Sequence, residues 1–126
     1  MTLPQRARVE AAPNFLANLD DARRFLRDQD ETTAQARFGK LRGDLREMVA
    51  VLAWTPAGGR PARFLSARSA QARLRAARIQ ALAAEAGLPY LREYVIGRYI
   101  VLYAHSATEV VLLALKHERQ LGYSVT

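Results

Sequence analysis

The spacing of the hydrophobic residues changes once along this 126-residue chain, and that change constrains the fold more than any other feature. Up to residue 54 the apolar residues recur every three or four positions, as they do on one side of an amphipathic helix. From residue 91 to residue 116 they form runs rich in Tyr, Val, Ile and Leu, which are typical of β-strands. The pattern predicts an α+β protein in which helices precede one antiparallel sheet.

Residues 6–54 predict a short strand followed by two helices. Residues 6–12 predict the strand, and Pro13 begins a helix that runs to about Asp28. A second helix follows Asp30 or Thr32, either of which can cap its amino terminus. The apolar faces of these helices consist of Phe15, Leu19, Ala22 and Leu26 in the first and of Phe38, Leu41, Leu45, Met48, Val49 and Leu52 in the second.

Residues 55–61 predict a loop after the second helix, because they contain two glycines and two prolines. Gly58 and Gly59 lack the spacing and the downstream Lys-Ser/Thr of a phosphate-binding loop, so we expect a flexible connector. A third helix is predicted over residues 69–86, which are rich in Ala, Leu and Arg and are followed by the stop signal of Gly87. Its leucines lie on the same side of the helix as arginines, so the helix has no clean apolar face and we expect it at the periphery of the fold.

The net charge of +7 comes almost entirely from one segment. Residues 1–55 contribute +1 and residues 82–126 are neutral, whereas residues 56–81 contain six arginines and no acid. Such a segment is typical of a surface that binds nucleic acid or an acidic protein segment, and the alternative is a solvated surface without a partner. The arginines that we expect to contact a partner are Arg68, Arg75 and Arg78.

Three strands are predicted over residues 91–96, 98–105 and 108–116, joined by hairpin-sized connections into an antiparallel meander. Strict alternation along the last strand places Val111, Leu113 and Leu115 on one face and Val110, Leu112 and Ala114 on the other. One face should pack on the helices. We expect the face with Val111, Leu113 and Leu115 to stay open for a partner, and the alternative is that the third helix covers it.

The composition narrows the function classes. The chain has no cysteine, which excludes disulfides, cysteine nucleophiles and thiolate metal sites. His105 is expected to be solvated, and nothing supplies a third ligand beside His105 and His117, so no metal or other cofactor is expected. The longest aliphatic run is shorter than the ~20 residues of a membrane helix, and residues 1–8 carry no secretory segment. We expect one cytoplasmic domain over residues 1–126, with neither a membrane nor a small-molecule substrate as partner.

The order of these elements, together with particular residues, resembles the RelE/ParE superfamily of toxins from bacterial type II toxin–antitoxin modules. Residues 13–25 are similar to that family's first helix, and residues 34–52 with the Gly59-Arg60-Pro61 loop are similar to its second helix and the loop after it. The most specific similarity lies in Tyr99 to Tyr103 and in residues 110–123, which carry a His-x-Arg ending.

The departure from the family lies in residues 62–88. In a typical member the chain passes almost directly from the Gly-Arg-Pro loop into the next strand. Here a helical insertion of about five turns intervenes, at ~3.6 residues per turn. Most of the surplus arginines lie in it or just before it, so the resemblance says little about their role.

The resemblance implies a growth-inhibiting toxin, of a kind associated with plasmid stabilisation, that a cognate antitoxin protein neutralises. ParE-like members poison DNA gyrase and have no known hydrolytic site, whereas RelE-like members are ribosome-dependent endoribonucleases that cut messenger RNA. We prefer the ParE-like interpretation, with binding of DNA gyrase and no hydrolysis. The alternative is a RelE-like ribonuclease, although this chain has two lysines in place of the lysine cluster typical of those enzymes.

RNA cleavage by a 2′-hydroxyl requires a base, an acid and cations that stabilise the phosphate. His117 and Arg119 share a face of the last strand and Tyr123 follows, so these three are the catalytic candidates under the ribonuclease alternative. Arg92 and Arg98 from neighbouring strands could complete one basic pocket as phosphate or target contacts. The plainer interpretation is that the His117 ring bonds to the backbone or to Glu118, and that Tyr123 packs over the end of the sheet.

Overall fold

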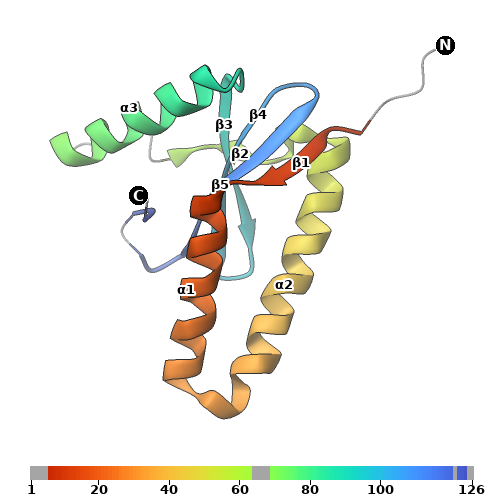
Figure 1. The fold of residues 1–126 in the computed structure, drawn as a ribbon, viewed down its shortest axis with the longest axis vertical. Coiled ribbons are helices and arrows are strands. Elements are labelled where there is room, and N and C mark those ends of the chain that lie inside the picture. Colours follow the sequence, from red (N-terminus) through yellow and green to blue (C-terminus); the bar gives the residue numbers. More distant parts are fainter. Residues whose placement is uncertain (1–5, 64–68, 121, 125–126) are drawn as a thin grey trace.

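The computed structural model describes residues 6–63, 69–120 and 122–124 of the chain. Within them three α-helices and a five-stranded mixed sheet form an α+β fold (Figure 1). The elements in chain order are β1 (Arg8–Ala11), α1 (Pro13–Gln29), α2 (Glu31–Trp54), the 3₁₀ turn η1 (Pro56–Gly58), β2 (Arg60–Pro61), α3 (Ala70–Glu85), β3 (Tyr90–Ile96), β4 (Tyr99–His105) and β5 (Glu109–His117). No helix in the described ranges is long and apolar enough to cross a bilayer.

The sheet has the strand order β1-β5-β4-β3-β2. Strands β3, β4 and β5 form the predicted antiparallel meander, but the predicted three-stranded sheet is incomplete because a strand joins at each edge. β1 pairs parallel to β5, with Val9 opposite Val110. β2 pairs with β3, with Pro61 opposite Arg92, in a segment predicted as loop. A proline is tolerated there because an edge strand leaves one side of its backbone unpaired.

The two long helices form a hairpin with a single residue between them. Pro13 stands at the first helical position of α1, where its missing N–H has no partner to lose. Asp30 ends α1 and caps α2, because its Oδ1 accepts a hydrogen bond of 3.0 Å from the Thr32 backbone N–H. The cap is therefore Asp30, one of the two residues that the sequence offered for it.

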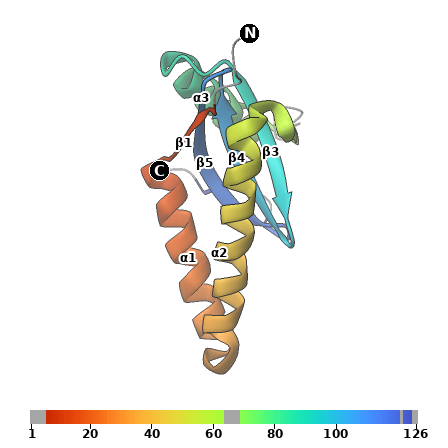
Figure 2. The same ribbon diagram turned by 90° about the vertical axis from the view of Figure 1, so that its right-hand side faces the viewer.

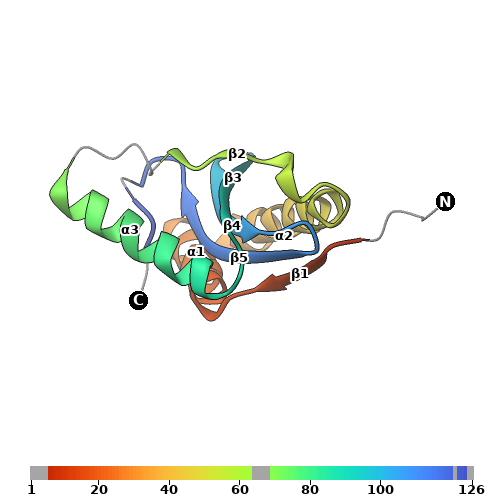
Figure 3. The ribbon, with the colours of Figure 1, turned by 90° about the horizontal axis from the view of Figure 1, so that it is seen from above.

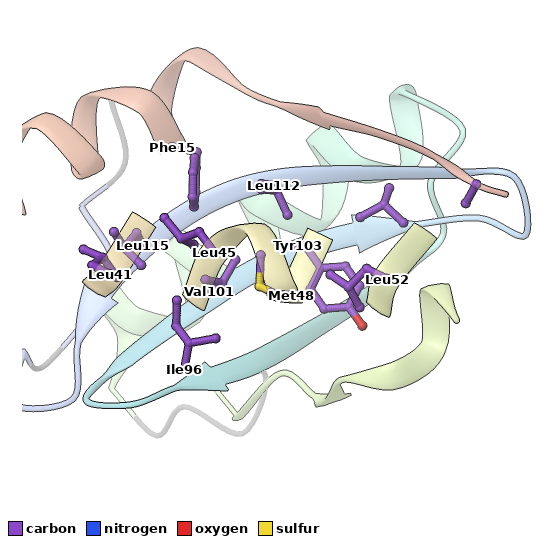
Figure 4. Packing of buried hydrophobic residues seen from close by; sticks show 12 residues of the cluster. Phe15, Leu41, Leu45, Met48, Leu52, Ile96, Val101, Tyr103, Leu112 and Leu115 are labelled. Carbon is purple, nitrogen blue, oxygen red and sulfur yellow. The ribbon is translucent and has the colours of Figure 1, made fainter. Parts of the chain in front are cut away.

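α1 and α2 cover one face of the sheet, and the main core lies between them and the strands (Figures 2 and 4). Leu52 from α2 and Val101, Tyr103 and Val110 from the strands have no exposed surface. The sequence predicted this apolar stripe of α2, since Leu41, Leu45, Met48 and Leu52 are its four buried residues. Truncating such a side chain to alanine costs about 2–5 kcal/mol, so this layer holds the fold together.

A bulge in β5 changes which side chains share a face. Leu102 pairs with Ala114 but Tyr103 pairs with Leu112, so Leu113 is an extra residue. Val110, Leu112 and Leu115 consequently pack in the core beneath α1 and α2, while Val111, Leu113 and Ala114 pack on the opposite side. Strict alternation is therefore wrong for Leu115 and Ala114, because one additional residue reverses the direction of those that follow it.

α3 lies over the second face of the sheet, apart from α1 and α2 (Figure 3). Its Ile79 packs in a cluster with Leu102 and Ala114, and its Ala83 packs with Leu88 and Ala104. Val111 and Leu113 are partly buried against these clusters, so the expectation of an open face is wrong and the alternative, coverage by the third helix, is right. The apolar face of β5 that carries Val111 and Leu113 is therefore covered by the chain's own third helix.

α3 ends where the sequence predicts. Gly87 has a φ of 75°, a left-handed conformation that glycine adopts without steric cost. The Leu88 N–H bonds to the Ala83 carbonyl at 2.9 Å and the Gly87 N–H bonds to the Ala84 carbonyl at 3.0 Å, which together form a Schellman cap. Leu88 and Ala83 also lie in one apolar cluster, so the cap fixes the carboxyl end of α3 against the sheet.

Candidate functional site

A groove of about 880 Å³ lies between the helical hairpin and the end of the sheet. It forms because α1 and α2 continue past the strands (Figure 1). One wall comes from the two helices, and the other comes from the β3–β4 turn at Gly97 and Arg98 and from the end of β5 at His117. Residues of four separate segments of the chain therefore meet in it.

The groove is positively charged. Its lining contains two carboxylates, Asp21 and Asp44, against the five cations Arg37, Lys40, Arg98, Lys116 and Arg119. Lys40 pairs with Asp44 at 3.1 Å on the exposed side of α2. The lining residues carry a net charge of +3 with His117 neutral, and one of these charges, the Lys116 ammonium, lies 5.5 Å from the centroid of the Tyr123 ring. None of these cations belongs to the arginine-rich segment of residues 56–81, and a shared pocket was predicted from the sequence for only two of the five, Arg98 and Arg119.

Two aromatic rings stand at the sheet side of the groove. The rings of Tyr99 and His117 meet edge to face with centroids 5.3 Å apart, because these residues are direct cross-strand partners. Burial raises the pKa of Tyr99 above its usual value, while the charge of Arg37 acts in the opposite direction. Phe25 of α1 lines the opposite wall and remains 54% exposed. A ligand in the groove would meet both cations and apolar rings.

The imidazole of His117 is oriented by the chain that follows it. Its Nδ1 accepts a hydrogen bond of 3.2 Å from the Arg119 backbone N–H, and the His117 N–H donates to Gln120 Oε1 at 2.8 Å. This geometry assigns the proton of a neutral ring to Nε2. The backbone bond agrees with the plainer interpretation of His117, which offered the backbone or Glu118 as partner. Of the residues proposed for one basic pocket, His117, Arg119 and Arg98 line the groove.

Tyr123 does not join them. It is 4% exposed on the face covered by α3, where it packs near Ile79 and its hydroxyl donates a short hydrogen bond to Glu93 Oε2. Burial, assisted by the Glu93 contact, raises the pKa of Tyr123 far above its usual value. The predicted pocket of His117, Arg119 and Tyr123 is therefore wrong, because the phenol is buried against Glu93 and does not line the groove.

Glu93 is the centre of a buried polar cluster that the sequence did not reveal. It is 3% exposed, and its Oε1 accepts the Arg63 backbone N–H at 2.8 Å and lies 3.6 Å from Arg60 Nε. Arg60 Nε is itself buried without a hydrogen bond among the described residues. The cluster ties the strand β2, the strand β3 and the carboxy-terminal tail together beneath α3.

Arg92 does not line the groove with Arg98 either. Its Nε donates to His105 Nε2 at 3.0 Å, and its Nη1 donates to the Gly59 carbonyl at 3.2 Å. His105 is 5% exposed, so the expectation that it is solvated is wrong. Since Nε2 accepts from Arg92, Nδ1 is the nitrogen that donates to the Ser106 carbonyl at 3.0 Å. Both side chains serve to join β3 and β4 to the turn before β2.

Gly59 is a close-packing position and not the flexible connector that was expected. A Cβ at Gly59 would lie 2.5 Å from the Glu93 carbonyl oxygen and 2.7 Å from the Tyr103 hydroxyl. The Tyr103 hydroxyl accepts the Gly59 N–H and donates to the Pro56 carbonyl, each at 2.8 Å. Burial raises the pKa of Tyr103 above its usual value. The segment is held by one buried phenol, which requires glycine opposite it.

The predicted partner-binding residues are dispersed. Arg75 and Arg78 are exposed on α3, whereas Arg68 lies outside the described residues. Leu113 is partly buried under α3, and Leu115 is buried on the other face of the sheet. In the part of the chain that the structure describes, no three His, Asp or Glu side chains form a cluster that could hold a metal ion. 

Comparison with known proteins identifies no relative by sequence. No model of a known protein family matches the chain, and a search of curated proteins finds no significant match. The basic groove and the buried Glu93 cluster therefore have to be interpreted from their own chemistry.

Proposed function

We propose that this chain is the toxin of a type II toxin–antitoxin module, which inhibits growth by binding an essential target and is neutralised by a cognate antitoxin. The proposal rests on the resemblance of the sequence to the RelE/ParE superfamily. It is supported by the order of the elements, in which a strand, a helical hairpin and a Gly-Arg-Pro segment precede an antiparallel meander. The inserted α3 stands between the Gly-Arg-Pro segment and that meander.

The position of Tyr123 favours binding over hydrolysis. A ribonuclease built from His117, Arg119 and Tyr123 needs all three groups around one phosphate. Tyr123 is buried on the far side of the sheet and is hydrogen-bonded to Glu93, while the other two line the open groove. We therefore propose the ParE-like activity, with DNA gyrase as target and with the cationic groove contacting an acidic surface of that target.

One observation keeps the ribonuclease as the second candidate. His117 lines the same groove as Arg98 and Arg119, and an imidazole with two guanidinium groups can hold a phosphodiester and move its proton. In this version the histidine alone would transfer protons, and Tyr123 would have only a structural role.

Controlled expression of the chain in bacteria separates the two candidates. A gyrase poison should induce the DNA-damage response, and the purified chain should inhibit supercoiling by gyrase. His117→Ala should retain both effects, since binding through the groove does not require a proton-transferring imidazole. Rapid arrest of translation with cleaved messages, abolished by His117→Ala, would instead establish the ribonuclease. Absence of any growth defect would contradict the toxin proposal as a whole.

A further inference from the structure

The outward side of α3 has a composition that its inward side does not share. Inward, its buried residues Ala76, Ile79 and Ala83 are small or β-branched, and Ile79 and Ala83 pack against strand residues. Outward, Leu74 is 72% exposed and Leu82 is 51% exposed. The amino-terminal half of α3, which contains Leu74, projects beyond the sheet (Figures 1 and 3). Leu82 lies in the carboxy-terminal half, on a helix whose other side packs on the sheet.

Leu74, Arg78 and Leu82 form one continuous stripe along the helix. They are spaced four residues apart, and at about 100° per residue such positions lie one above another on a single side. Arg75 stands beside the stripe and leans over the carboxy-terminal tail, where a Cβ on Gly122 would come within 3.1 Å of its Nη1. We call Leu74, Arg78 and Leu82 the α3 stripe.

The charge around the α3 stripe is positive on balance. Arg73, Arg75 and Arg78 are exposed, and none of them forms an ion pair with a carboxylate in the described ranges. Glu85, at the last position of α3, is its single acidic residue. A complementary surface must therefore offer carboxylates or phosphates to the arginines and apolar groups to the leucines.

Exposed leucines beside arginines favour a protein helix over a nucleic acid or a lipid surface as the acidic partner. A phosphate backbone has no apolar groups to cover Leu74 and Leu82. A lipid surface has them, but a helix that lies in a membrane interface keeps its cations on the polar side, away from its leucines. In the α3 stripe Arg78 lies between the two leucines, so α3 lacks the separate apolar side that such a helix inserts. An amphipathic helix with a leucine seam and flanking glutamates meets both requirements.

We infer that the α3 stripe, with Arg75 beside it, is a docking site for an acidic amphipathic helix of a protein partner. That this helix belongs to the neutralising antitoxin rests on the proposed function, whereas the docking chemistry does not. The helical insertion would then be a platform for the partner, placed outside the sheet and away from the basic groove.

A direct test uses the full chain and a fluorescein-labelled synthetic helix of about 20 residues, ~30 Å long, with leucines along one seam and glutamates beside it. Fluorescence anisotropy should show saturable binding that weakens with salt. A peptide of the same composition with its leucines dispersed around the helix should bind at least about tenfold more weakly. Equal binding of the two peptides would overturn the inference.

Variants of α3 locate the site. Leu74→Gln with Leu82→Gln, and separately Arg78→Gln, should each weaken peptide binding by about tenfold. Matched controls are Leu16→Gln, an exposed leucine of α1, and Arg73→Gln, which removes the same charge from another side of α3. Circular dichroism should be unchanged in all of them, since every altered side chain is exposed. Controls that lose as much affinity as the stripe variants would contradict the assignment.

Two further measurements separate partner class from function. In the first, the wild-type chain is mixed with anionic vesicles, duplex DNA or the acidic peptide. If it bound the vesicles or the DNA but not the peptide, and the leucine variants abolished that binding, a protein helix would be the wrong class of partner. Growth inhibition by the chain that carries Leu74→Gln and Leu82→Gln should persist, because the groove is intact. A harmless wild-type chain that still binds the peptide through the α3 stripe would contradict the proposed function and leave the docking site standing.

Discussion

Tyr123 of the carboxy-terminal tail donates a short, buried hydrogen bond to Glu93 of β3. The two residues are 30 positions apart, and the contact holds the tail against the face that α3 covers. Asn14 and Asn18 of α1 hold the same tail from the other direction, because both side chains donate to the Ser124 carbonyl. Tyr123 and Ser124 are thus fixed to both layers of the fold.

Removing the Tyr123 hydroxyl should destabilise the protein. Tyr123→Phe leaves Glu93 buried with one partner fewer, which costs about 1–3 kcal/mol in the free energy of unfolding. Urea denaturation monitored by circular dichroism measures this cost. Tyr94→Phe is the matched control, since that phenol is only partly buried beside the main core. Equal stability of Tyr123→Phe and wild type would contradict a structural role for the bond.

The same phenol predicts a loss of stability in alkali. Burial raises the pKa of Tyr123 in the folded protein, so near its ordinary value of 10.0 only the unfolded chain releases the proton. The stabilisation is complete below about pH 10 and decreases as the pH rises further, because ionisation then favours the unfolded state. The free energy of unfolding, measured from about pH 9 to pH 11, should fall, and less steeply in Tyr123→Phe. The slope that remains would come from Tyr99 and Tyr103, whose pKa values burial also raises.

Adding one methyl group to different glycines should have opposite effects. Gly59→Ala places a Cβ 2.5 Å from the Glu93 carbonyl oxygen, so backbone must move and the protein should lose several times RT, about 1–3 kcal/mol. Gly43→Ala on α2 meets nothing within 4 Å and should gain about 0.5–1 kcal/mol from helix propensity. Thermal unfolding of both variants checks the pair. A Gly59→Ala protein as stable as Gly43→Ala would mean that the β2 segment is not packed as described.

Under the proposed function, neutralising two groove cations should weaken binding to gyrase without changing the fold. Arg98→Gln with Arg119→Gln lowers the charge of the groove lining from +3 to +1, so binding to the target should weaken and depend less on salt. Arg23→Gln with Arg24→Gln removes the same charge from α1, where both arginines pair with Asp20 outside the groove. Supercoiling inhibition at several salt concentrations compares the two. If the α1 variant lost as much inhibition, total charge and not the groove would control binding.

Local signals in the sequence determined the elements. Each of these signals involves residues that are close together in the sequence. Four such predictions are confirmed: the apolar period of α2, Pro13 at the start of α1, Asp30 between the helices and Gly87 after α3. The antiparallel order of β3, β4 and β5 was also predicted from the sequence, because strands joined by short hairpin connections pair antiparallel.

Tertiary structure decided which residues meet. The parallel pairing of β1 with β5 joins segments about a hundred positions apart, and the bulge at Leu113 depends on the register between β4 and β5. That register places Leu115 under the helices and not on the face predicted for it, while Tyr123 reaches Glu93 and not His117. Hydrophobic period is a property of neighbouring residues, whereas a groove, a buried carboxyl cluster and the face of a side chain depend on contacts between distant ones. The sequence by itself therefore determined the helices and strands of this protein, and only their packing decided that its cations converge on one groove.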